Sequence, residues 1–136
     1  MKIMSTRAGA VEVDEREVIN FPEGLVGIPF WQSAVLLPIP EVGELCWLQA
    51  VDDPDAAFLL LKVGDYFPQY DENLARACAE LPDGAVYSIV RVPQDDLSRA
   101  TTNLMGPVII DLSAATGKQV VLHDSGYDLR QPLFGS

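Results

Sequence analysis

The chain has 136 residues, a length that suits one domain covering residues 1–136. Its apolar content of 49% and charged content of 21% are those of a globular protein and argue against a chain that is disordered throughout. Twenty Asp and Glu residues against nine Lys and Arg give a net charge of −11. This charge opposes binding to nucleic acid or to an anionic membrane. It leaves two interpretations open, a basic protein partner or solubility alone.

The cysteine content and the apolar runs indicate a compartment. Cys46 and Cys78 lie far apart in the chain and form no Cys-x-x-Cys motif, so they predict no disulfide framework. Their apolar neighbours predict two reduced thiols in the core. The first residues lack the apolar segment of a secretory signal, and the longest apolar run, residues 56–61, is too short to span a bilayer. We therefore expect a cytoplasmic protein.

Short strand patterns, separated by Gly, Pro and Asp, fill the first half of the chain. The segment from Ala10 to Glu15 alternates apolar and polar residues as a half-buried strand does. The expected strands cover residues 10–15, 18–21, 33–39, 46–51 and 57–63. The last two flank Asp52-Asp53-Pro54-Asp55, a turn-forming cluster, and so predict a hairpin with a short acidic loop.

Residues 71–81 predict the main helix. Asp71 is a favourable N-cap, and Pro82 disfavours helical backbone at the residue before it. Leu74, Cys78 and Leu81 share one helical face, which we expect to be the buried one.

Strand patterns return after this helix. They cover residues 85–92, 107–112 and 118–123, and the last two predict a second hairpin around residues 113–117. The tail, residues 127–136, either packs back onto the core or stays loose. The fold class is therefore all-β, a small antiparallel barrel-like or sandwich domain with one or two short helices.

Little in the sequence predicts catalysis or metal binding. His123 is the only imidazole, and its neighbours Asp124 and Ser125 form no triad with it because adjacent side chains on a strand point to opposite faces. Pro54 interrupts the ligand spacing of the acidic loop, and the loop lacks the Gly and the bidentate Glu of a calcium-binding loop. We expect a structural histidine, a solvated turn, and no bound cofactor or metal.

Two further segments combine turn residues with large apolar side chains. Gly24 and Gly27 do not match a phosphate-binding loop and predict positive φ in a tight corner, with Phe30 and Trp31 packed beneath it. Asn103 precedes Leu104 and Met105 in a segment that ends with Gly106-Pro107. Asn103 predicts an Asx turn, and its two apolar neighbours belong either to the core or to an interface.

Three blocks, taken together and in order, resemble the flagellar assembly factor family (FliW). The first is Phe21-Pro-Glu-Gly-Leu-Val-Gly-Ile28, similar to the family's Phe-x-x-Gly-Leu-x-Gly-Phe. The second is Leu48-Gln-Ala-Val-Asp-Asp-Pro-Asp-Ala-Ala-Phe58. The third is Asn103-Leu-Met-Gly-Pro-Val-Ile-Ile-Asp111, followed by Gly117-Lys-Gln-Val-Val-Leu122. The resemblance spans roughly residues 10 to 133.

Membership of this family implies a cytoplasmic regulator without catalytic residues. The implied partners are flagellin and the carbon storage regulator (CsrA), a small basic RNA-binding dimer that represses translation of flagellin mRNA. Flagellin would hold the family member until export, after which it would bind the regulator and release the mRNA. The candidate protein-binding residues are Asn103, Leu104, Met105, Pro107, Asp52, Asp53 and Asp55.

Two alternative functions remain open. One is a small-molecule-binding β-barrel, whose cavity would be lined by Phe30, Trp31, Trp47 and Phe58. The other is a hydrolase that uses a pair of carboxylates. A filled barrel interior would argue against the first, and a buried acid pair with raised pKa values would support the second.

Overall fold

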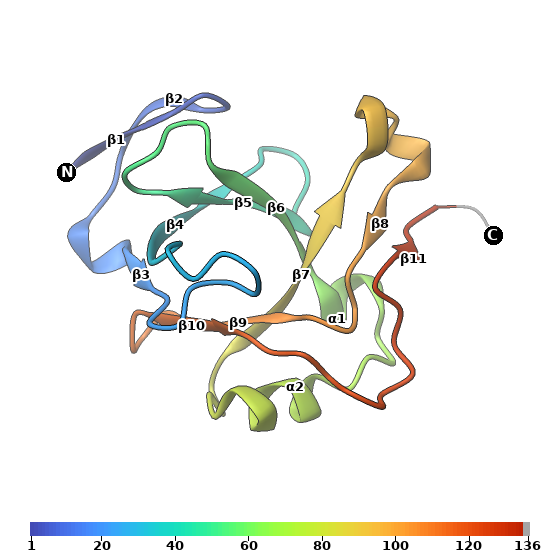
Figure 1. The fold of residues 1–136 in the computed structure, drawn as a ribbon. Coiled ribbons are helices and arrows are strands. Elements are labelled where there is room, and N and C mark those ends of the chain that lie inside the picture. The colour runs from blue at the N-terminus through green and yellow to red at the C-terminus, as the bar shows by residue number, and fades with distance from the viewer. Residues whose placement is uncertain (135–136) are drawn as a thin grey trace.

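Seven strands close into a barrel in the computed structural model, which describes residues 1–134 (Figure 1). They are β3 (Ile19–Asn20), β4 (Ser33–Pro38), β5 (Leu45–Ala50), β6 (Ala57–Lys62), β7 (Ala85–Arg91), β9 (Val108–Asp111) and β10 (Thr116–Gln119). Neighbours around the barrel follow the order β7-β6-β5-β4-β3-β10-β9, and β9 pairs again with β7. The pairs are antiparallel except for β3–β10, which is parallel. The predicted all-β, barrel-like fold is confirmed, with this one parallel pair in addition.

Large apolar side chains fill the barrel. Ile19, Phe21, Leu48, Leu60 and Ile110 are each at most 1% exposed and belong to one contiguous cluster. Trp31 joins this cluster, and its ring meets that of Phe58 edge-on at 5.0 Å between centroids. A filled interior argues against the small-molecule barrel that the sequence left open.

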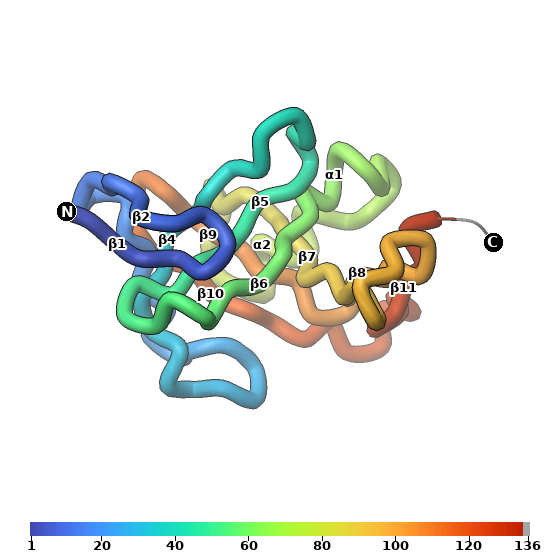
Figure 2. Tube along the Cα trace, turned by 90° about the horizontal axis from the view of Figure 1, so that it is seen from above, coloured from blue at the N-terminus to red at the C-terminus, as the bar shows by residue number. Residues whose placement is uncertain are grey.

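A separate hairpin covers the outer face of the sheet. It consists of β1 (Lys2–Ser5) and β2 (Gly9–Glu12), and it lies across β4 and β5 (Figure 2). Ile3 and Val13 pack there against Val35 and Leu37. Two-residue strands β8 (Thr101–Thr102) and β11 (Gln131–Pro132) extend the sheet from the far end of β7.

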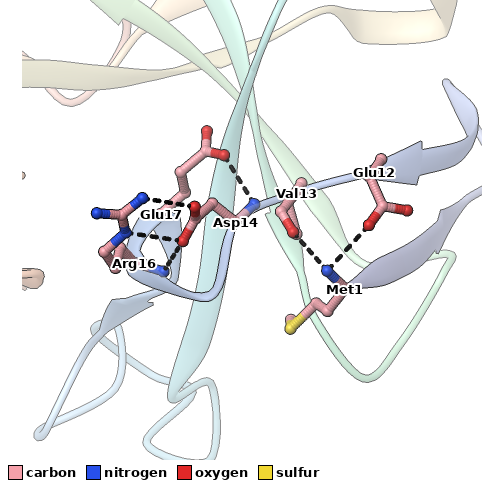
Figure 3. A network of polar contacts seen from close by, with 6 residues as sticks. All are labelled: Met1, Glu12, Val13, Asp14, Arg16 and Glu17. Atoms are coloured by element: carbon pink, nitrogen blue, oxygen red, sulfur yellow. Dashed lines mark hydrogen bonds and ion pairs between the residues drawn. The ribbon is translucent and has the colours of Figure 1, made fainter.

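The strand expected over residues 10–15 ends early, at Glu12. Asp14 instead caps the 3₁₀ helix η1 (Glu15–Glu17): its side chain accepts a hydrogen bond from the Arg16 amide, and the Glu17 carboxylate accepts one from the Asp14 amide (Figure 3). The Arg16 guanidinium also bonds the Asp14 carboxylate, which lowers the pKa of Asp14. The reciprocal cap explains why the strand ends at Glu12 although the alternating pattern continues to Glu15.

The predicted helix is present as α2 (Glu72–Ala79), with Asp71 as its N-cap. It ends before Leu81 because Glu80 adopts left-handed backbone with φ 58°. Of the predicted buried face only Leu81 is confirmed, since it is half-buried and packs against the core, whereas Leu74 and Cys78 are exposed. Ala75 and Ala79 are buried instead, in a cluster that includes side chains of β7 and β9.

The remaining elements are short. They are α1 (Val63–Tyr66) and the 3₁₀ helices η2 (Pro93–Asp95) and η3 (Leu97–Arg99). The tail packs back over most of its length: the Tyr127 ring contacts the Tyr70 ring, and β11 pairs with β8. Residues 135–136 of the predicted tail lie outside the described residues. No helix of the described chain is both long and apolar enough to cross a membrane.

Candidate protein contact surfaces

The corner loop, residues 21–32, joins β3 to β4 and projects from the barrel (Figure 2). Leu25 and Ile28 exchange backbone hydrogen bonds of 2.9 and 3.2 Å, and the predicted positive φ angles are present, 66° at Gly24 and 83° at Gly27. A Cβ on Gly24 would lie 2.5 Å from the Pro29 backbone, so no larger residue fits there. The corner loop is therefore tightly folded.

Phe30 does not pack beneath this corner, as the sequence had predicted. Its side chain is 78% exposed, while Trp31 beside it is 8% exposed and enters the barrel core. Phe30 lies in a turn that is closed by the Trp31 amide, which donates to the Ile28 carbonyl (3.1 Å), and only Trp31, at the end of this turn, reaches the interior. Phe30 thus stands on the surface as an apolar side chain on a rigid loop.

One side chain joins the first family-like block to the third. Gln119 on β10 accepts a hydrogen bond from the Val26 amide (2.9 Å) and donates one to the Gly106 carbonyl (2.9 Å). A Cβ on Gly106 would approach the Asn103 and Gln119 amide nitrogens at 2.8 and 3.2 Å. A residue larger than Gly at position 106 would therefore crowd the Asn103 and Gln119 side chains that form these hydrogen bonds.

Asn103 forms the predicted Asx turn. Its Oδ1 accepts hydrogen bonds from the amides of Met105 (3.1 Å) and Gly106 (2.9 Å). Leu104 is buried at 5% exposure, and its carbonyl accepts a 2.6 Å hydrogen bond from the Tyr70 hydroxyl. Pro107 is also buried, whereas Met105 is half-buried. Burial places Leu104 and Pro107 in the core and leaves Met105 as the apolar side chain of this segment that reaches the surface.

The acidic loop, residues 51–56, connects β5 and β6 and is held from beneath by Gln49. This side chain is fully buried, and its Nε2 donates to carbonyls of the loop and its flanks, including Asp53 at 2.9 Å and Ala56 at 3.2 Å. The Gln49 side-chain amide therefore holds the acidic loop in place through these hydrogen bonds. Gln49 belongs to the second family-like block.

The three loop carboxylates are exposed, as predicted, but they are not equivalent. Asp55 bonds the Thr6 hydroxyl of the β1–β2 hairpin, and its carbonyl accepts from the Arg7 guanidinium (3.2 Å). Among the described residues, the Asp53 carboxylate accepts only the amide of Asp55 within its own turn (3.1 Å). Among the described residues, the Asp52 carboxylate has no hydrogen-bond or ion-pair partner. Asp52 and Asp53 are thus the carboxylates available to a partner.

Sequence reasoning missed a second exposed apolar region at the opposite end of the sheet. Here a hollow of about 270 Å³, the apolar hollow, lies between β6, β7 and the tail. Its lining includes Val42, Tyr66, Leu97 and Phe134, all partly exposed, with Leu97 at 57%. The only sequence signal was an apolar residue isolated among polar ones, as at Leu97, and this pattern does not distinguish a surface side chain from a buried one.

The titratable residues assemble no catalytic constellation in the described part of the chain. His123 lies beyond the end of β10 and is exposed, so the prediction that it ends a strand was wrong. The buried polar residues are Ser5, Gln49, Ser88 and Thr102, none of them acidic. Hydrogen bonds from Ser113 and Ala114 lower the pKa of Asp111. No cluster of His, Cys, Asp and Glu suited to a metal is present among residues 1–134.

The two cysteines differ, contrary to the prediction of two core thiols. Cys46 is half-buried, and burial raises its pKa to about 11. Cys78 is exposed on α2 because the alanine face of the helix, not its own, meets the sheet. Neither thiol lies in a setting that would activate it.

A family model described as "FliW protein" matches residues 2–133. The chain belongs to the FliW family. It is 37% identical to the flagellar assembly factor FliW of Moorella thermoacetica, an alignment that covers 98% of this chain and 89% of the relative. It is 36% identical to that of Natranaerobius thermophilus, covering 98% and 93%. A crystal structure of the flagellar assembly factor FliW superposes with a TM-score of 0.86 at 27% identity, covering 100% of this chain and 99% of the other.

Residues of the three family-like blocks have identifiable structural roles in this fold. Phe21 fills the barrel, Gly24 admits the Pro29 backbone, and Gln49 supports the acidic loop. Asn103 forms a turn, and Gln119 ties that turn to the corner loop. These residues build the scaffold of the corner loop, the acidic loop and the Asn103 turn.

Proposed function

We propose that this protein is a cytoplasmic, non-catalytic regulator of flagellum assembly. In this proposal it binds flagellin, and when flagellin leaves the cell it binds the carbon storage regulator CsrA and relieves repression of flagellin mRNA. The observation that carries the proposal is the family match over residues 2–133, in which the block residues occupy coherent structural positions. The open barrel cavity and the buried acid pair that the two alternatives need are not found among the described residues.

The net charge of the chain supports the proposed binding to CsrA. A protein of net charge −11 attracts a basic partner over a range set by the Debye length, ~8 Å at physiological salt. Once docked, it would repel the phosphates of an RNA at a similar distance. It would therefore weaken RNA binding without covering the RNA site itself.

The exposed apolar surface supports the proposed binding to flagellin. The terminal helices of flagellin are amphipathic, and such a helix binds by laying its apolar face against apolar side chains. We propose that the segment Asn103–Pro107 takes part in this contact through Met105, which is half-buried on a rigid turn. Leu104 would act only indirectly, by holding the segment in place.

The test measures binding of the purified chain to flagellin and to CsrA by calorimetry, each at low and high salt. We expect both to bind and CsrA affinity to fall as salt increases, because screening weakens exposed charge pairs. CsrA affinity that does not change with salt would show that the contact is apolar. Failure to bind either protein would overturn the proposed function.

A further inference from the structure

A hollow of about 290 Å³ lies where the corner loop meets the acidic loop, and we name it the corner hollow. The two loops connect β3 to β4 and β5 to β6 in an antiparallel arrangement and therefore leave the barrel at the same end, where Thr6 and Arg7 of the β1–β2 hairpin contact the acidic loop. The hollow is lined by Phe30, Trp31, Gln32, Ser33, Ala50, Asp52, Asp53 and Ala56. One side is therefore aromatic and the other side carries two carboxylates.

The aromatic side of the corner hollow is held rigidly. Trp31 is anchored in the core, and the corner loop is fixed by the Gly24–Pro29 contact and by the Gln119 bridge to Val26. Phe30 is exposed although it sits on this fixed loop. Because the backbone of this loop is already fixed, a partner that covers Phe30 has only the side-chain rotamer to order, so Phe30 is well suited to be an anchor.

The polar groups of the corner hollow remain available to a partner. Asp52 and Asp53 form no ion pair within residues 1–134, whereas Asp55 is engaged with the hairpin. The Trp31 Nε1–H, on a side chain more than nine-tenths buried, has no acceptor among the described residues. Buried donors of this kind normally have an acceptor, and because a guanidinium has none, a main-chain carbonyl of the bound segment would be the group that supplies it.

The acidic loop already holds one arginine, on its hairpin side. Arg7 donates to the Asp55 carbonyl and places its guanidinium 5.0 Å from the centre of the Trp47 ring. The corner hollow offers the same pair of features, an aromatic face and oxygen acceptors, and adds two carboxylates. A guanidinium is the side chain that stacks on an aromatic ring and pairs with carboxylates in one geometry.

We propose that the corner hollow binds an arginine-bearing segment of a basic protein partner. The guanidinium pairs with Asp52 and Asp53 and stacks on Phe30. This inference rests on the proposed function, since it assigns the corner hollow to CsrA and leaves the amphipathic helices of flagellin to the apolar surfaces elsewhere.

Two variants test this assignment, Phe30→Ala and the double variant Asp52→Asn with Asp53→Asn. Asparagine keeps the side-chain oxygen that bonds the Asp55 amide, so the loop retains its turn. The matched control is Asp83→Asn with Asp128→Asn, which removes two exposed charges elsewhere. We expect at least tenfold weaker CsrA binding for each hollow variant, less than threefold weaker binding for the control, and unchanged flagellin binding. Thermal melts verify that each variant is folded.

A second measurement does not depend on CsrA. A short arginine-containing peptide amide is titrated into the ¹⁵N-labelled chain, and the indole N–H signals of Trp31 and Trp47 are followed. We expect the Trp31 signal to shift, and the Asp52→Asn, Asp53→Asn variant to abolish the shift.

The outcomes separate the inference from the proposed function. If the wild-type chain does not bind CsrA but the peptide shifts Trp31, the proposed function fails and the corner hollow stands as an arginine site. If CsrA binds the hollow variants as it binds the control, or if the peptide leaves Trp31 unmoved, the inference is overturned. Loss of flagellin binding alone, or loss of a dimer of this chain, would assign the hollow to that other occupant and would also overturn it.

Discussion

Gly117→Ala should destabilise the barrel through one contact. Gly117 lies on β10, and a Cβ at this position would approach the Phe21 ring carbons Cε2 and Cζ at 2.6 and 2.7 Å. Carbon atoms in favourable contact are ~3.5 Å apart, so the ring would have to move by about 0.9 Å. Phe21 is fully enclosed, with 0% exposure, and has no open space to move into.

The expected cost follows from two opposing effects. Adding a methyl group to a filled core destabilises a protein by about 1–3 kcal/mol. Replacing Gly by Ala in a strand also stabilises the folded protein by roughly 0.5–1 kcal/mol, because Ala restricts the unfolded chain more than Gly does. We therefore expect a net loss of up to about 2.5 kcal/mol in the free energy of unfolding, centred on ~1 kcal/mol, and a melting temperature lower by up to about 9 °C.

Urea denaturation of a double-mutant cycle with Phe21→Leu checks this explanation. Leucine lacks the two ring carbons that collide with the new methyl group, so Gly117→Ala should be nearly neutral in that background. The coupling between the two changes should reach about 1 kcal/mol. Equal losses in both backgrounds would show that the Phe21 ring is not the cause and would refute the reasoning.

Three further outcomes are expected. In urea denaturation, Leu104→Ala should lower the free energy of unfolding by about 2–4 kcal/mol, and Met105→Ala should lower it by less than about 1 kcal/mol. Reduced flagellin binding by the stable Met105→Ala variant would support a contact role for Met105. Normal flagellin binding by this variant would exclude that role. Gln49→Ala should speed amide hydrogen exchange in the acidic loop more than in α2, because the loop loses its internal donor. At pH 8 a thiol reagent should modify Cys78 quickly and Cys46 slowly, since burial raises the Cys46 pKa to about 11 and leaves little thiolate; the Cys46 rate should rise as the pH approaches 11, and a fast reaction retained by Cys78→Ser would contradict this.

Strand content could be read from the sequence because hydrophobic alternation and turn residues act locally. The hairpin around the acidic loop and the Asx turn at Asn103 both depend on neighbouring residues, and both were predicted. The exposed state of Asp52 and Asp53 followed in the same way from turn chemistry.

Features that depend on contacts between distant segments were not predictable. The buried face of α2 is set by how closely the helix approaches β7 and β9, which favours Ala75 and Ala79 over the larger Leu74. Phe30 has the composition of a core residue, and only the path of the corner loop turns it outward. Strands β8 and β11 have two residues each and exist only through their pairing.

The parallel seam between β3 and β10 has a consequence for synthesis of the protein. The two strands meet at Asn20 and Thr116, so the barrel closes only after nearly all of the chain has been made. At roughly 5–20 residues per second, translation of the segment between them takes about 5–20 s. Until then β3 has no partner on that side, and the corner loop lacks the Gln119 bridge. In a nascent chain the corner loop is therefore not yet held in its final position, and it is completed only once β10 has been synthesised.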